Sequence, residues 1–68
     1  MRKYVIYFRP GVQETSIQSA VSGCRAIRNS IEREQDRTIL TVHVPDENAS
    51  TLEDQLDEAN DVTNWLAA

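Results

Sequence analysis

The sequence has one cysteine, two prolines and two glycines among its 68 residues. Because Cys24 stands alone, the chain can form no internal disulfide, and no cysteine-based zinc site can be assembled. So few prolines and glycines exclude a low-complexity chain. We therefore expect a globular protein in which Cys24 is a small buried apolar residue.

Long apolar runs are also missing. No stretch approaches the roughly 18 apolar residues of a membrane-spanning helix. The N-terminal Met1-Arg2-Lys3 leads directly into a strand-like segment instead of the apolar region of a signal peptide. The sequence predicts a single domain, residues 1–68, that is soluble and cytoplasmic with no membrane partner, or a piece excised from a larger precursor.

Basic residues are absent from the second half of the chain. All seven lysines and arginines precede Thr38, where four acids leave a formal charge of +3, whereas seven acids and no base follow. The net charge of −4 argues against nucleic acid as a ligand, because phosphate binding needs a concentrated basic surface. The asymmetry fits a solvated acidic helix face, head-to-tail self-association, or steering of a charged partner.

Two segments, Tyr4 to Phe8 and Thr38 to Val44, have the composition of β-strands. Since successive residues of a strand point to opposite sides, the first segment is apolar on both faces, which indicates a central strand. Two strands alone make a marginal sheet in water. The best candidates for further strands are Ala26 to Arg33 and Val62 to Leu66.

Both of these additional strands have a helical alternative. Apolar residues from Ile17 to Ile31 also fit one long helix, but Gly23 would then lie inside it at a cost of about 1 kcal/mol. Gly23 therefore favours a first helix that ends there. The second helix is expected to begin with a capping box formed by Ser50 and Glu53, and to end at Asn60-Asp61 or to continue to Leu66.

The favoured order is β-α-β-β-α-β, an α+β ferredoxin-like split sandwich with a four-stranded antiparallel sheet and both helices on one face. The other face of the sheet would be bare, unless long side chains such as Arg28 or Lys3 fold over it. A bare apolar face is a candidate docking surface. The residues expected on it are Val5, Tyr7, Ile39, Thr41 and His43.

No set of residues with catalytic or ligand-binding spacing is present. His43 is the only histidine, and no acid, base or nucleophile is grouped with it in the sequence. The carboxylates lack the spacing of a calcium loop, and there is no glycine-rich phosphate cradle. We therefore expect a protein that is not an enzyme and that has no metal ion or cofactor.

The order of residues resembles the subtilisin propeptide and its free-standing relatives, the inhibitor I9 family of serine protease inhibitors. The similar segments are Lys3 to Arg9, Gly23 to Ile27, Leu40 to Pro45 and Asp61-Val62. The resemblance implies that the bare sheet face docks on a subtilisin-type protease. It also implies that Leu66, Ala67 and Ala68 form a tail that lies like a substrate in the cleft of the protease.

The sequence thus predicts a small protein-binding module, with a propeptide-like inhibitor or folding chaperone of a subtilisin-type protease as the most specific role. One alternative is a structural or regulatory domain that self-associates, with a homodimer as the expected form. Another is an acidic mimic that binds a basic protein through the carboxylates between Asn48 and Asp61.

Overall fold

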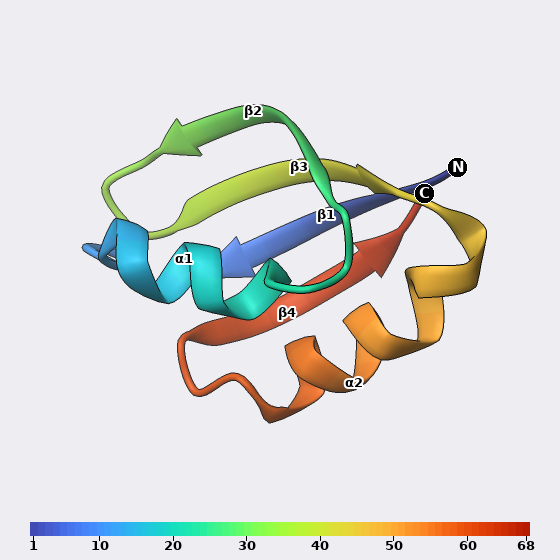
Figure 1. Cartoon of the computed structure of the whole chain (residues 1–68). Helices are drawn as coiled ribbons and strands as arrows, with labels where there is room; N and C mark the ends of the chain where they lie inside the picture. Colours follow the sequence, from blue (N-terminus) through green and yellow to red (C-terminus); the bar gives the residue numbers. More distant parts are fainter.

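The computed structural model describes residues 1–68. Four strands and two helices alternate in the expected β-α-β-β-α-β order (Figure 1). The elements are β1 (Arg2–Phe8), α1 (Glu14–Val21), β2 (Ile27–Arg33), β3 (Thr38–Val44), a short 3₁₀ turn η1 (Asp46–Asn48), α2 (Ala49–Glu58) and β4 (Val62–Ala67). Both helical alternatives for the additional strands are therefore wrong, and the α+β fold is confirmed.

The strands form one antiparallel sheet in the order β2-β3-β1-β4. β1 and β3 are the two central strands, as the apolar character of both faces of β1 predicts. Both helices pack on the same side of the sheet, and the other side carries no element (Figure 1). Two layers of this kind bury the apolar stripe of each helix against one face of the sheet.

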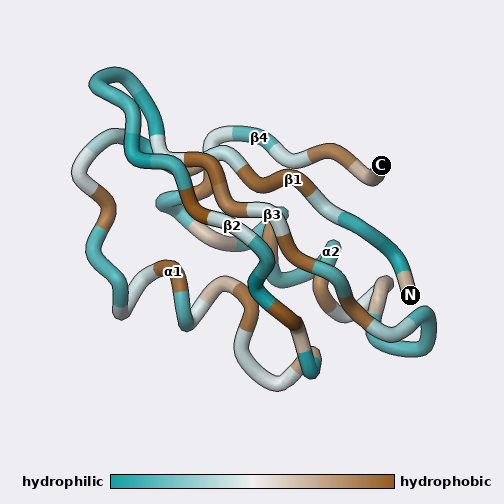
Figure 2. Tube along the Cα trace, turned by 90° about the horizontal axis from the view of Figure 1, so that it is seen from above, coloured by the Kyte–Doolittle hydropathy of each residue, from teal (hydrophilic) through white to brown (hydrophobic).

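The core lies between the sheet and the two helices. Alternate residues of β1 and β3 point into it, and Figure 2 shows the hydrophobic segments recurring along both strands. Cross-strand partners such as Ile6 and Leu40 are both fully buried. The fully buried side chains from the helices are Ile17, Leu52 and Leu56, with Leu56 only 1% exposed.

Two backbone positions after the end of α1 redirect the chain into β2. Gly23 has φ of 74° and Arg25 has φ of 56°, both in the left-handed region. A helix cannot continue through such residues, because right-handed helical backbone requires negative φ. This turn separates Val21 from Ile27 and excludes the single long helix.

A bulge in β2 changes which of its residues share a face. Arg28 lies opposite Val42 and Ser30 opposite Thr41, so that Asn29 is an extra residue on β2. Ile27 therefore pairs with His43 on the bare face, whereas Ile31 pairs with Leu40 on the helix-covered face. Simple alternation along a regular strand would put both isoleucines on one face, so the bulge is what separates them.

The expected capping box at Ser50 and Glu53 is also absent. η1 leads directly into α2, which begins at Ala49 with Asn48 as its N-cap, and no side chain bonds to the free backbone N–H groups there. Ser50 thus lies inside the helix. Glu53 has a tertiary partner instead, because its Oε2 accepts a hydrogen bond of 2.5 Å from the Tyr4 hydroxyl.

Candidate functional site

The bare side of the sheet, called the open face below, is the candidate functional site. The register of β1 and β3 brings the five residues expected there together. Val5 lies opposite Thr41 and Tyr7 opposite Ile39, while His43 is opposite Lys3. All five are half-buried, because each is covered by its neighbours on the sheet but by no helix.

The open face extends across both edge strands. On β2, Ile27 lies opposite His43 and is 54% exposed. On β4, Leu66 lies opposite Val5 and is 50% exposed. Apolar side chains therefore cross all four strands. Sequence reasoning missed Ile27 on this face because a bulge leaves no mark in the hydrophobic pattern. It expected Leu66 at the end of the last strand and as the first residue of a tail, and did not count it among the residues of the sheet face.

One end of the open face carries a cation. The Arg37 guanidinium carbon lies 5.1 Å from the centre of the Tyr7 ring, within the range of a cation–π contact. Its Nε donates to Glu34 Oε1 at 3.0 Å, and this hydrogen bond raises the pKa of Arg37. A hollow beside the Tyr7 ring is lined by Thr63, Asn64 and Leu66.

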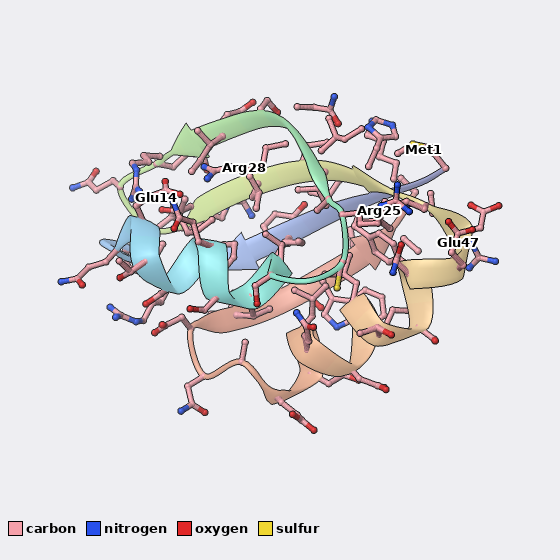
Figure 3. The ribbon with its side chains drawn as sticks, viewed as in Figure 1. Met1, Glu14, Arg25, Arg28 and Glu47 are labelled. Atoms are coloured by element: carbon pink, nitrogen blue, oxygen red, sulfur yellow. The ribbon has the colours of Figure 1, made fainter.

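Arg28 does not fold over the open face. It pairs with Glu14 of α1 on the helix-covered side, where the two side chains point toward each other (Figure 3). The reason is the register, since Arg28 lies opposite the core residue Val42. The hydrogen bond from Arg28 holds the pKa of the Glu14 carboxyl below its usual value.

His43 has a single polar partner. Its Nδ1 is hydrogen-bonded to Oδ1 of Asn29, the bulge residue of β2. The arrangement fixes the imidazole on the sheet surface, next to Ile27.

The three residues expected to form a tail belong to the sheet. Leu66 and Ala67 are the last residues of β4, and the Ala68 N–H donates to Lys3 O at 2.9 Å. The indole of Trp65 anchors this strand from the other side, since its Nε1 donates to Asp57 Oδ1 at 2.8 Å. In the free chain these residues are therefore paired with β1, and their role as a substrate-like tail stays a prediction.

Cys24 lies in the core, as the sequence predicts. Its side chain is fully buried, and burial raises the pKa of the thiol. The Cys24 thiol donates to Gln55 Oε1 at 3.5 Å, while the Gln55 amide nitrogen donates to the carbonyls of Ala20 and Ser22. Gln55 thus joins α2 to the end of α1, and Cys24 lies beneath that contact.

The side chains that could bind a metal ion do not form a cluster. No three His, Cys, Asp or Glu side chains lie close enough together to share a metal ion. No helix combines the length and the apolar character needed to cross a membrane.

Comparisons with family models, with curated proteins and with solved structures gave no significant match.

Proposed function

We propose that this chain is a small, non-enzymatic protein-binding module that docks through the open face of its sheet. The observation that carries the proposal is that all four strands contribute apolar side chains, called the apolar strip below, to the side that no helix covers. Apolar side chains gathered on one face mark interaction sites more often than single scattered ones do. The members of the strip are Ile27, Ile39, Val5, Tyr7 and Leu66.

As the partner we propose a subtilisin-type serine protease, which the chain would inhibit or help to fold. The support is the resemblance of Lys3 to Arg9 and of Leu40 to Pro45 to the I9 family, in which this same sheet face docks on the protease. Because Leu66 to Ala68 are paired with β1, the open face would supply the binding energy. Entry of the C-terminal residues into the protease cleft would require them to leave the sheet.

The test uses two isoleucines of one strand that lie on opposite faces. Ile27→Lys places a charge in the apolar strip, and Ile31→Lys places the same charge on the helix-covered face, where Ile31 is 38% exposed. The inhibition constant for a subtilisin is measured for both variants. We expect Ile27→Lys to weaken inhibition about tenfold, as the loss of about 1.4 kcal/mol of apolar contact implies, and Ile31→Lys to leave it unchanged.

Absence of inhibition by the unmodified chain would remove the protease as the partner. The second candidate function is self-association through the same face, which is favoured by the exposure of Ile27 and Leu66 at its two ends. Light scattering separates the two candidates. A stable dimer that Ile27→Lys dissociates, and Ile31→Lys does not, would assign the open face to a second copy of the chain.

A further inference from the structure

The outer edge of β4 has backbone hydrogen-bonding groups that no strand of this chain pairs. β4 is the last strand of the sheet and has only β1 as a neighbour. In an antiparallel pair, every second residue directs its backbone N–H and C=O toward the neighbouring strand. Because the Ala68 N–H donates to Lys3 O, the backbone groups of Leu66 and Asn64 also face β1. Those of Trp65 and Ala67 therefore point outward.

This edge lacks the features that protect edge strands from pairing. Charged side chains, prolines and central bulges are the usual means. β2, the opposite edge, has three charged residues and a bulge in its middle. β4 has the sequence VTNWLA without charge or proline. Its one irregularity lies near its start, beside Tyr7 and Phe8 of β1, so that Asn64 to Ala67 remain regular.

An acidic helix runs alongside this edge. α2 lies next to β4 (Figure 1), and the bond between Asp57 and the Trp65 indole joins them. Asp54 lies three residues before Asp57 and therefore on the same side of the helix, whereas Glu58 lines the groove between α1 and α2. Asp54 and Asp57 are both exposed, and no basic residue follows Arg37 in the chain.

From these observations we infer that the outer edge of β4 binds an extended, basic segment of a partner protein by strand addition. The backbone of the segment would pair with Trp65 and Ala67, and its lysine or arginine side chains would lie against Asp54 and Asp57. A second β4 fits less well, since it would bring two acidic α2 helices together. The inference concerns a different surface from the open face and does not depend on it.

The test is an NMR titration of the ¹⁵N-labelled chain with two blocked seven-residue peptides, one alternating lysine with valine and one alternating glutamate with valine. We expect the lysine peptide to shift the amides of Trp65 and Ala67 and to slow their hydrogen exchange. Raising the salt concentration should weaken this binding, because the charges are exposed. Equal binding of both peptides, or no change at these two amides, would overturn the inference.

Two variants test the two parts of the contact separately. Asp54→Asn removes one charge beside the edge and should weaken lysine-peptide binding about two- to fivefold. Glu32→Gln on the opposite edge is the matched control and should have no effect. Ala67→Pro removes an outward N–H without breaking a bond to β1, and it should abolish binding. Unchanged binding by Asp54→Asn or by Ala67→Pro contradicts strand addition here, whereas Ile27→Lys should leave the peptide contact intact.

Discussion

At the scale of single residues, the least expected contact joins the core to α2. Tyr4 is completely buried, and its hydroxyl donates to Glu53 Oε2 at 2.5 Å. Burial, and then the Glu53 carboxylate, raise the pKa of Tyr4. A buried phenol needs a hydrogen-bond partner. Glu53 is therefore a structural residue, although the sequence suggests a helix cap.

The substitution Tyr4→Phe removes this hydrogen bond and leaves Glu53 half-buried without its donor. We expect the free energy of unfolding to fall by about 1.5 kcal/mol, since a hydrogen bond to a charged group is involved. Tyr7→Phe is the matched control, because the Tyr7 hydroxyl makes no hydrogen bond, and it should change stability by less than about 0.5 kcal/mol. Urea unfolding of both variants measures the difference. Equal losses would show that Glu53 does not stabilise the core.

The turn between α2 and β4 should make stability depend on pH. Arg9 Nε donates to Asp61 Oδ1 at 2.5 Å, and this hydrogen bond lowers the pKa of Asp61. A carboxyl whose pKa is lower in the folded state stabilises the fold above its unfolded pKa, near 4, and this contribution is lost as the pH falls through the folded value.

We therefore expect Asp61→Asn to flatten the loss of stability of the wild-type chain between about pH 5 and pH 2. Arg9→Gln removes the same pair from the cationic side and should flatten the profile to a similar extent. Thermal melts across this range measure the effect. If the stability of the variants fell with pH in parallel with that of the wild type, solvent screening would have removed the contribution of the Arg9–Asp61 pair to stability.

At the scale of elements, the start of α2 differs from its sequence signature. The capping box pattern at Ser50 and Glu53 requires non-helical backbone at the serine. Because η1 precedes the helix, the backbone is already helical at Asn48, with φ of −100° and ψ of −2°. The first turn of the helix is thereby shifted toward the N-terminus, and Ser50 becomes an exposed interior residue.

Ser50→Ala should leave the free energy of unfolding unchanged or raise it by a few tenths of a kcal/mol, because alanine is the better helix former. A true N-cap serine would instead lose about 1 kcal/mol on the same change. Denaturant unfolding distinguishes these outcomes. A loss of that larger size would place the helix start at Ser50 after all.

At the scale of the whole molecule, the last strand of the chain is paired with the first (Figure 1). The register pairs Tyr4 with Ala67 and Val5 with Leu66, and Ala68 bonds to Lys3. Residues that a protease partner would engage as a tail are thus also part of the sheet. Their loss would affect stability and binding together.

Deletion of Leu66 to Ala68 should therefore lower the free energy of unfolding by about 1–3 kcal/mol, since backbone pairs with β1 and the contact of Leu66 are lost. The variants Leu66→Ser and Ala68→Ser keep the backbone and serve as controls. Unfolding curves and binding are measured together for all three. If the deletion variant were as stable as the wild type, Leu66 to Ala68 would make no contribution to the stability of the sheet.

Much of the fold follows from local pattern. The alternation in Tyr4 to Phe8 and Thr38 to Val44 predicts both central strands and the side of the sheet on which their residues lie, because the side-chain period of a strand is 2. It also predicts which five residues of these strands share the open face. Cys24 in the core follows in the same way, since a lone cysteine behaves as a small apolar residue.

By itself, then, the sequence determined the class of the fold, its two central strands and the middle of the open face, because these depend on periodic burial. Only the tertiary structure decided how the residues of the two edge strands are placed. The bulge at Asn29 moves Ile27 onto the open face, and pairing with β1 takes up Leu66 to Ala68. Glu53 accepts a hydrogen bond from Tyr4, a residue 49 positions away. Each of these outcomes depends on a partner distant in the chain, which no local pattern encodes.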